Sequence, residues 1–595
     1  MYIESLNYPF QVNVIHKKKR AIKKELLQGV GFIEKKIAIL GGSTTAEIKD
    51  ILELFLLKEG IKPLFYESEY NQYFEDALFE NKTLKEFSPD IVYIYTTKVN
   101  IDHYPTATDT DEEVRVKLDT ELHKFKSIWE KIRGEYNCII IQNNFELPFY
   151  RTLGNLDFSN FHGKTNFIMK LNMAFADHSQ NHEGFYICDI NYLSAWFGLE
   201  KWHDKKFWYS YKYALSYDAI SLLAHNIATI IKAIYGRSKK CLILDLDNTL
   251  WGGIIGDDGS DNIKIGEETA VAEAYTAFQS YIKELKARGV ILAVCSKNDA
   301  AIASEGFSHP DSILKLDDFA SFKANWNAKH HNIQEIASEI NIGTNSLVFV
   351  DDNPAEREIV RAQMTEVEVP EIGDDIVKFI TYLDKEGYFE PVNLSEDDTK
   401  RAEYYKKNMH REHFQVAFAD YKEFLQSLEM KAEIKAFTPA YQDRITQLIN
   451  KTNQFNLTTK RYSSTEIGVI SQNNQYLTLY GRLSDKFGDN GLISIIIGSV
   501  KERDLHLDLW LMSCRVIKRD MELAMFDALV AECISKGLKQ IFGYYFKTAK
   551  NSMVADHFEQ LGFKLLSKEE SGDSVWQYVI LTNYELKNKC IEVTI

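Results

Sequence analysis

The sequence has few cysteines and no paired cysteine motif. Only seven of the 595 residues are Cys, and they are scattered singly, with no Cys-x-x-Cys spacing. This excludes a zinc ribbon or a framework held by disulfides, and it indicates reduced thiols. The first residues contain no basic segment followed by an apolar core, so we expect no signal peptide and a cytoplasmic protein.

Positive charge and long apolar runs are also scarce. Lys and Arg number 70 against 86 Asp and Glu, which gives a net charge of −16. A general nucleic-acid binder needs clustered Lys and Arg, so we expect no nucleic-acid partner. The one basic run, at 17–20, is short and fits a solvated helix face. No apolar run approaches the ~20 residues of a membrane span, so none is expected.

Length and patterning predict three α/β domains. A chain of 595 residues is too long for one core. Short apolar runs alternate with helical patterns, which is typical of α/β domains. The predicted parts are a helical lead-in at 1–35, a doubly wound domain at 36–236, a second α/β domain at 237–392, a helical connector at 393–429 and a mixed α/β domain at 430–595.

The most informative stretch is an apolar run that ends in two carboxylates. Residues 241–244 read as a buried strand, Asp245 and Asp247 follow, and residues 252–259 read as a Gly-rich hairpin. An isolated Asp-x-Asp usually marks a solvated turn. Directly after a strand, however, residues two apart start on one face. Two such carboxylates raise each other's pKa unless a cation lies between them, so the pair predicts a metal ion or a shared proton.

Three further polar clusters follow in the same α/β segment. A strand at 290–295 ends in Ser296, Lys329 opens a helix at about 330–340, and a strand at 346–350 ends in Asp351 and Asp352. Ligands bind at the carboxyl ends of strands in an open α/β sheet. Taken alone, Ser296 or Lys329 would be an ordinary surface residue, but the order and context indicate one site.

In this order the four clusters resemble the motifs of the haloacid dehalogenase (HAD) phosphatase superfamily. The resemblance implies a Rossmann-like core and hydrolysis of phosphate esters through an aspartyl-phosphate. It implies that Asp245 is the nucleophile and that Asp247 protonates the leaving oxygen and later activates water. Ser296 would hydrogen-bond the phosphoryl group, and Lys329 would neutralise its charge.

The resemblance also implies a Mg²⁺ ion and a core without a cap domain. The ion would take oxygens from Asp245, the backbone carbonyl of Asp247 and the Asp351–Asp352 pair, with Asp352 as the favoured direct ligand. Lys323 is an alternative for this lysine role. We prefer Lys329, because Lys329 opens the helix that leads to the strand before Asp351. The gaps between the motifs are too short for a cap, so an open site would admit a long or carrier-borne substrate.

The turn at residues 41–43 connects a predicted strand to a predicted helix. Its Ser43 resembles the nucleophile of SGNH-type hydrolases, although the Asp of that family's Gly-Asp-Ser turn is absent. The resemblance implies Asn143 or Asn144 as the oxyanion residue and His203 as the general base of an esterase or acyl hydrolase. The alternative is that Ser43 caps a helix and His203 is a surface residue.

The last domain resembles the GNAT acyltransferase fold. Strands followed by a helix and a further strand carry the resemblance, and a second helix is predicted at 549–560. The acetyl-CoA loop of that family contains two glycines, which are both missing from residues 515–520. Backbone approach to a pyrophosphate would be poorer without them, so acetyl-CoA binding is in doubt.

Longer motifs closely resemble FkbH-like proteins, which form subfamily IIIC of the HAD phosphatases. These motifs are at 244–253, 296–299, 349–357, 451–458 and 487–491. The resemblance implies a phosphorylated small acyl donor and transfer of a glyceryl-type acyl group to the thiol of an acyl carrier protein, in polyketide-like or surface-polysaccharide biosynthesis.

Such a transfer needs a thiol on the enzyme. Cys514 is the best candidate because it ends a predicted strand just before a helix, where the helix and Arg515 would lower its pKa. Cys295 adjoins Ser296, but strand alternation would point it away from the phosphate. The alternative to an enzyme is a scaffold that binds phosphorylated or phosphopantetheinyl ligands without chemistry.

Overall fold

A computed structural model of the chain describes residues 2–29, 31–394, 420–548, 550–581 and 583–594, with Tyr404, Arg411, Phe414 and Phe418. The chain forms two units, Met1–Ile234 with Ser463–Glu466, and Tyr235–Tyr462 with Ile467–Ile595. Most of the predicted connector at 393–429 lies outside the described residues, and its described part contains α20 (Tyr421–Ser427). Among the described helices, none combines the length and apolarity that crossing a bilayer requires.

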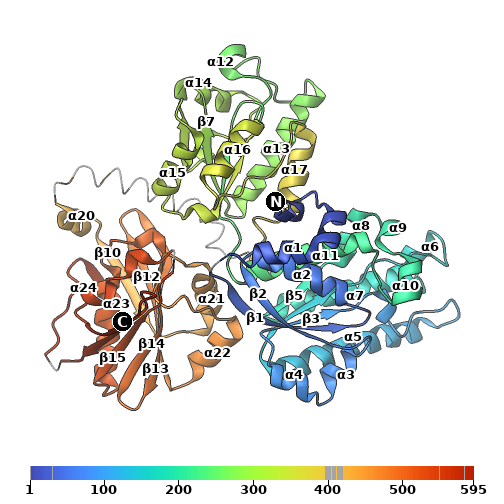
Figure 1. Ribbon diagram of the computed structural model, residues 1–595, viewed down its shortest axis with the longest axis horizontal. Coiled ribbons are helices and arrows are strands. Elements are labelled where there is room, and N and C mark those ends of the chain that lie inside the picture. The colour runs from blue at the N-terminus through green and yellow to red at the C-terminus, as the bar shows by residue number, and fades with distance from the viewer. Residues whose placement is uncertain are drawn as a thin grey trace. The chain divides into compact units, whose positions relative to one another are not determined.

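The first unit contains a parallel sheet in the order β2-β1-β3-β4-β5 (Figure 1). This is the flavodoxin-like order of doubly wound folds. The strands are β1 (Ile33–Gly41), β2 (Ile61–Glu67), β3 (Ile91–Tyr95), β4 (Ile139–Asn143) and β5 (Phe185–Cys188). The sequence pattern predicts strands at 36–40, 91–95, 138–142 and 185–189, which agree with β1, β3, β4 and β5, and it does not predict β2. The order of the strands reverses between the neighbours β1 and β3, and Ser43 follows the end of β1.

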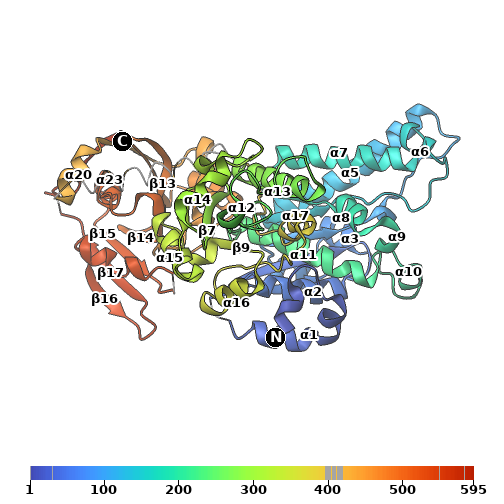
Figure 2. The same ribbon diagram turned by 90° about the horizontal axis from the view of Figure 1, so that it is seen from above.

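Helices cover both faces of this sheet. Figure 2 shows α5 and α7 on the opposite side from α1 and α2. Alternate residues of β1, Ala38 and Leu40, share a core with Phe125 and Trp129 of α5. The helices are α1 (Val12–Leu26), α2 (Ala46–Lys58), α3 (Tyr73–Leu78), α4 (Lys82–Phe87), α5 (Asp111–Tyr136), α6 (Leu156–Ser159), α7 (Lys164–Asn181), α8 (Ile190–Phe197), α9 (Leu199–Trp202), α10 (Lys205–Tyr211) and α11 (Tyr217–Ile234).

The second unit begins with a parallel sheet in the order β8-β7-β6-β9. Leu242 and Leu244 of β6 pack with α13 and α17, while Cys241 and Ile243 pack with α15 and α16. The strands are β6 (Cys241–Leu244), β7 (Ile291–Ser296), β8 (Ser321–Ala324) and β9 (Leu347–Val350). The helices are α12 (Ile255–Asp258), α13 (Ala270–Ala287), α14 (Ala300–Glu305), α15 (Lys329–Glu339), α16 (Pro354–Gln363) and α17 (Ile376–Lys385). This is the expected Rossmann-like core.

The connections of this sheet are short, with one correction to the prediction. The predicted hairpin at 252–259 is wrong, because residues 255–258 form the helix α12 and Gly252 instead bridges to Lys264. Gly253 adopts a φ of +94°, which favours glycine at this bend. Residues 241–353 are all described, and α12 and α13 are the only helices between β6 and β7. No inserted cap domain covers the strand ends in this segment.

The second unit ends with a larger, mostly antiparallel sheet. Its order is β16-β17-β15-β14-β13-β12-β10-β18, with β11 paired to β14. The strands are β10 (Met430–Lys435), β11 (Phe455–Asn456), β12 (Tyr476–Asp485), β13 (Gly488–Lys501), β14 (Asp504–Met512), β15 (Gln540–Tyr545), β16 (Lys564–Lys568), β17 (Ser574–Val579) and β18 (Ile591–Thr594).

Helices accompany both faces of this sheet. In chain order, the helices are α21 (Gln442–Lys451), α22 (Ser464–Gln472), α23 (Met521–Ser535) and α24 (His557–Gln560). Ile445 and Leu448 of α21 pack on one face, and Met525 and Phe526 of α23 pack on the other. The predicted helix at 549–560 is wrong, because only the short turn η8 (Ser552–Val554) and α24 form there.

The segment that contains β11 fills a gap between two strands. β14 and β15 pair in parallel only where residues 504–506 lie opposite residues 540–542. Farther along, Phe455 and Asn456 pair with β14. The Leu457 N–H donates to the Trp510 carbonyl at 3.1 Å, and the Leu457 carbonyl accepts from the Phe546 N–H at 2.9 Å. The chain therefore satisfies the strand edges that an extended ligand would otherwise use.

Candidate functional site

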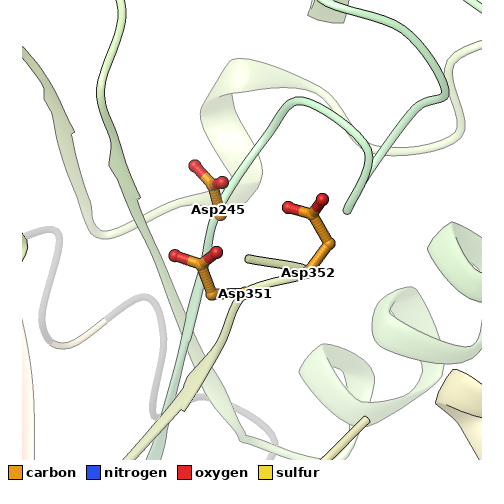
Figure 3. Close-up of side chains that lie close together, drawn as sticks. All are labelled: Asp245, Asp351 and Asp352. Carbon is orange, nitrogen blue, oxygen red and sulfur yellow. The ribbon is translucent and has the colours of Figure 1, made fainter. Parts of the chain in front are cut away.

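Three carboxylates converge at the carboxyl edge of the four-stranded sheet. β6 and β9 are paired neighbours with Leu244 opposite Val350, so Asp245 and Asp351 follow at the same level. One carboxylate oxygen from each of Asp245, Asp351 and Asp352 lies within 4.8 Å of the others (Figure 3). Asp245 is 7% exposed and Asp351 is fully buried. Asp352 is partly exposed, but three like charges at this spacing, two of them buried, require positive charge nearby.

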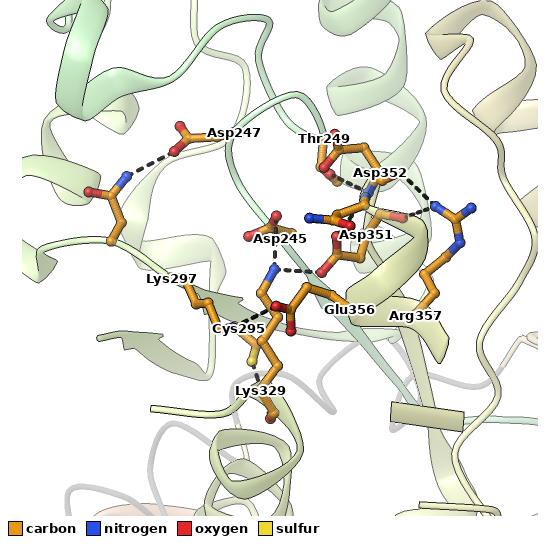
Figure 4. Close-up of polar contacts among 12 residues, drawn as sticks. Asp245, Asp247, Thr249, Cys295, Lys297, Lys329, Asp351, Asp352, Glu356 and Arg357 are labelled. Carbon is orange, nitrogen blue, oxygen red and sulfur yellow. Dashed lines mark hydrogen bonds and ion pairs between the residues drawn. The ribbon is translucent and has the colours of Figure 1, made fainter. Parts of the chain in front are cut away.

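Lys329 supplies one positive charge. As the first residue of α15, it places its Nζ 3.0 Å from Asp245 Oδ2 and 2.5 Å from Asp351 Oδ2 (Figure 4). Burial opposes the charged form, but Asp245 and Asp351 outweigh it and raise the pKa of Lys329. With the lysine and all three carboxylates ionised, the cluster keeps two negative charges in excess, so it has room for a divalent cation.

The oxygens of the cluster fit such a cation. Asp245 Oδ1 is buried and has no hydrogen-bond donor among the described residues. A buried acceptor without a partner costs about 1–3 kcal/mol, and a metal bond would satisfy it. Burial and the charge of Asp245 raise the pKa of Asp351 to about 6, and the same two causes raise that of Asp352. Carboxylate oxygens are the donors that Mg²⁺ prefers.

Asp247 is held apart from this cluster. Its Oδ1 accepts from the Trp251 indole at 2.9 Å and from the Ile255 N–H at 3.1 Å, and its Oδ2 accepts from the Asn298 amide at 3.0 Å. Figure 4 shows its side chain directed away from Asp245. The strand ends at Leu244, so strict alternation does not extend to Asp247. Burial, and secondarily Asp245, raise the pKa of Asp247, which favours a protonated carboxyl.

The remaining predicted HAD residues lie on neighbouring elements. Ser296 ends β7, beside β6, and is 1% exposed. Lys323 lies on β8, where it pairs with Glu335 at 3.2 Å and with Glu339, both on α15, rather than with the carboxylate cluster. Cys295 packs into the core beneath α15 on the other face, and burial raises the pKa of its thiol.

Two residues that the sequence did not single out fix the loop of Asp351 and Asp352. Arg357 Nη1 donates to the carbonyls of Asp351 at 2.8 Å and Asp352 at 2.7 Å. Thr249 Oγ1 accepts from the Asp352 N–H at 3.2 Å, which joins this loop to the one after β6. Both residues lie within the FkbH-like motifs at 244–253 and 349–357, which could have drawn attention to them. Their contacts with the backbone can be identified only from the folded structure.

Of the predicted acyl-hydrolase residues of the first unit, Asn143 and His203 contact other groups, whereas Ser43 Oγ is buried without a hydrogen-bond partner among the described residues. Ser43 is buried, and the N-cap of α2 is Thr45, so Ser43 is not the cap residue. The Asn143 amide donates to the Thr96 carbonyl and accepts from Tyr93. His203 Nδ1 lies 3.2 Å from the Ala214 carbonyl. Among the residues described in this unit, no hydrogen bond joins Ser43, Asn143 and His203 to one another.

Two other candidates complete the predicted set. The Asn144 amide donates to Asp189 at 2.7 Å, which ties it to the next strand end. Cys514 is the first residue of η7 (Cys514–Val516), which follows β14, and its side chain lies outside the described part of the chain.

The chain is similar to a known family in its first unit and to a solved structure over a longer stretch. The FkbH N-terminal domain matches residues 36–232. The N-terminal part of the protein BF1531 from Bacteroides fragilis, which contains a phosphatase domain and was crystallised with Mg, is 33% identical. That match covers 64% of this chain and 99% of that chain, with a TM-score of 0.59.

A much weaker similarity is found to the ribosomal-protein-S18-alanine N-acetyltransferase of Escherichia coli. It is 13% identical, covers 26% of this chain and 97% of that chain, and has a TM-score of 0.21. No curated protein matches the chain. The identity to BF1531 extends over nearly the whole of that structure, and the four HAD motifs meet at one sheet edge. The chain belongs to the FkbH-like family of HAD proteins.

Proposed function

We propose that the protein is a Mg²⁺-dependent phosphohydrolase acting on phosphate esters. The observation that carries the proposal is the buried cluster of Asp245, Asp351 and Asp352 beside Lys329. The Bacteroides fragilis relative supports it, because that structure contains a phosphatase domain and Mg. Asp245, Asp351 and Asp352 would hold the ion, which supplies positive charge against the oxygens of the phosphoryl group.

In the first half-reaction, the Asp245 carboxylate attacks phosphorus. The bond to the leaving oxygen breaks, and the protonated Asp247 carboxyl donates its proton to that oxygen. Lys329 holds the Asp245 carboxylate in place through Oδ2, at 3.0 Å. The Ser296 hydroxyl, at the end of the adjacent strand β7, would donate a hydrogen bond to a phosphoryl oxygen.

In the second half-reaction, Asp247 works as a base. It takes a proton from a water molecule, whose oxygen attacks the phosphorus of the aspartyl-phosphate and releases Asp245 and inorganic phosphate. The three donors around Asp247 keep its carboxyl in place for both steps. A raised pKa brings the two protonation states closer in population near neutral pH.

Replacement of the nucleophile tests the proposal. In Asp245→Asn, Mg²⁺-dependent hydrolysis of an aryl phosphate by the full chain should fall by at least about 10³-fold, because no carboxylate is left to attack. Asp257→Asn, on the exposed helix α12, is the matched control and should keep activity within about twofold. Undiminished turnover in Asp245→Asn would exclude the nucleophile, and a wild-type chain that binds but does not hydrolyse the ester would favour a scaffold.

We further propose that dephosphorylation is coupled to transfer of an acyl group to an acyl carrier protein. The FkbH-like motifs support this, as does the location of Cys514 directly after β14. The insertion of β11 beside β14 favours a carrier-borne partner over a ligand laid along the strand edge. An acyl-enzyme thioester would form when the Cys514 thiolate attacks the carbonyl carbon of an acyl phosphate and that phosphate leaves, and the carrier thiol would then displace Cys514. Asp245 would act on a separate phosphate ester of the same acyl group.

Intact-protein mass spectrometry tests this transfer. Incubation with a three-carbon acyl phosphate should add one acyl group to the wild-type chain and none to Cys514→Ser. Cys590→Ser is the control and should still be acylated. An adduct that persists in Cys514→Ser would exclude this thiol, and loss of the adduct on adding a holo-carrier protein would identify the acceptor.

A further inference from the structure

A cavity of about 270 Å³ lies in the second unit, away from the carboxylate cluster. Its wall includes Lys240 and Ser346, which directly precede β6 and β9. The carboxylates follow the opposite ends of these same two strands. A four-residue strand extends roughly 13 Å, so the cavity and the candidate phosphoryl site occupy opposite edges of one sheet.

The cavity wall carries a large excess of positive charge. Its basic residues are Lys240, Arg444, Lys451, Arg515 and Lys550, and Glu366 is its one acidic residue. The chain as a whole has a net charge of −16, so this local excess runs against the composition. Like charges around a small volume repel one another, and an anion bound among them relieves that repulsion.

Lys550 is the residue of the wall whose charge is least compensated by neighbouring carboxylates. Among the residues that the structure describes, no carboxylate lies within ion-pair distance of its ammonium group. The side chain as a whole is exposed, but desolvation at the cavity lowers the pKa of Lys550. The charges of Arg237, Lys239 and Arg461 lower it further, while Glu366 opposes them. The ammonium group therefore gains from an anionic partner.

Arg461 adds a charge behind the wall. Its guanidinium donates to the Thr452 carbonyl at 2.8 Å and to the Ile449 carbonyl and Asn453 side chain, which are all neutral acceptors. Thr452 and Asn453 line the cavity. Burial, with the charge of Arg237, lowers the pKa of Arg461 to about 10, so it stays positive at neutral pH. Its field adds to that of the wall.

The rest of the wall limits what the ligand can be. Hydroxyl and amide side chains of Thr344, Asn345, Gln454 and Ser513 supply further hydrogen-bonding groups. Ile342, Leu448 and Phe455 supply an apolar side. The volume excludes a polymer, and the excess of positive charge favours a group with two negative charges over a single carboxylate. We infer that this cavity binds the phosphate group of a small phosphorylated molecule, with Lys550 as a direct partner.

This inference goes beyond the proposed phosphohydrolase, because the cavity is remote from Asp245 and, among the described residues of its wall, Glu366 is the only carboxylate. The phosphate can come from a free metabolite or from a phosphopantetheine arm. Titration calorimetry with inorganic pyrophosphate and with 4′-phosphopantetheine, in EDTA and in the Asp245→Asn full chain, tests both sources without turnover.

Pyrophosphate should bind with a stoichiometry of one. Lys550→Ala should weaken it by about tenfold, since a hydrogen bond to a charged group is lost. Lys547→Ala, three residues earlier and outside the cavity, should leave it unchanged. Glu366→Gln should strengthen binding about two- to threefold, because it removes the one negative charge of the wall. Loss of packing could not increase affinity.

The two probes then assign the source of the phosphate. Tighter binding of 4′-phosphopantetheine, which as a free monoester has two negative charges, identifies a pantetheine-bearing ligand whose organic part would contact the apolar side, and equal affinities identify a free phosphorylated metabolite. Two results would overturn the inference: no saturable binding of either probe at millimolar concentration, or equal affinities in the Lys550→Ala and Lys547→Ala proteins.

Discussion

The loop after β6 and the loop after β1 have the same structural context, but their polar residues have different surroundings. Each follows a buried strand of a parallel sheet, and each carries polar residues at the carboxyl end of that strand. After β6, Asp245 meets two carboxylates from β9 and a lysine from α15, and negative charge is left over. After β1, Ser43 lies near strand ends whose amides are already bonded to their own sheet.

The difference shows what turns a strand end into a reactive site. Topology brings side chains together in both sheets, but only the β6 edge leaves groups whose charge the protein does not balance. Asn143 and Asn144 use their amides to fix neighbouring strands. Ser43 Oγ and Asp245 Oδ1 are both buried without a partner among the described residues, but the hydroxyl is neutral and the carboxylate is charged. Unbalanced groups, rather than the turn itself, distinguish the two regions.

Removing Lys329 should reduce phosphate hydrolysis more than any other change considered below. In Lys329→Met, the hydrolysis rate should fall by about 10²–10³-fold, because the nucleophile and Asp351 lose their shared cation. Lys323→Met, whose lysine pairs with Glu335 and Glu339, should stay within about twofold. Steady-state kinetics on an aryl phosphate measure both. Equal losses in the two variants would mean that Lys329 has no special role.

Removing the arginine should weaken the site through its metal ligands. Arg357→Gln breaks the two hydrogen bonds to the Asp351 and Asp352 carbonyls. Loss of such support typically costs 10- to 100-fold in metal affinity or activity. The Mg²⁺ concentration for half-maximal activity should rise more than kcat falls. Arg361→Gln, one turn later on α16, is the control and should leave that concentration nearly unchanged.

A change of pH should act on the metal-free cluster in a defined direction. The pKa of Asp351 is about 6, above its ordinary value of 3.8. Its contribution to stability is therefore present in full below the ordinary value and is lost as the pH rises through about 6. Only the ionised carboxylate binds Mg²⁺, and at pH 5 roughly one tenth is ionised.

The increase in Tm on adding Mg²⁺ should accordingly be small at pH 5 and larger at pH 7.5. Differential scanning calorimetry at the two pH values measures it. Asp351→Asn should flatten this dependence, and an increase that is the same at both pH values in the wild-type chain would contradict the assignment.

Ser43→Ala should have the smallest effect. The first unit's turn contributes nothing to the carboxylate cluster, so Mg²⁺-dependent hydrolysis of an aryl phosphate should change by less than about twofold. The same variant assayed on an aryl ester shows whether Ser43 has chemistry of its own. A large loss of phosphate hydrolysis would mean that the two sites depend on each other.

Much of the fold could be predicted because buried strands carry their own signal. Residues 241–244 and 347–350 are continuous apolar runs with polar residues directly after them. β6 lies inside its sheet, and β9, although an edge strand, is buried at every residue. The strands that were missed are mostly edge strands: β2, β8, β16 and β18. Edge strands need fewer apolar residues, so their pattern resembles that of loops. β16, for example, is exposed at every residue.

The candidate site was predictable in its residues but not in its contacts. The motifs named Asp245, Asp351 and Lys329, whose meeting follows from the order of parallel strands. They did not indicate that Asp247 is held by its own three donors, because the backbone leaves the strand at Leu244. The role of Arg357 depends on two backbone carbonyls, and no pattern of side chains predicts which carbonyl an arginine will reach.

The two-residue strand β11 has a consequence for the order of folding. Its hydrogen-bonded partners lie on β14 and just after β15, which are far along the chain. A segment with so little structure of its own cannot be ordered before those strands exist, so its closure is a late, long-range event. Thr452 to Phe455 belong to the cavity wall, and the cavity is complete only after that closure. An anion that binds there would therefore favour chains that have finished folding.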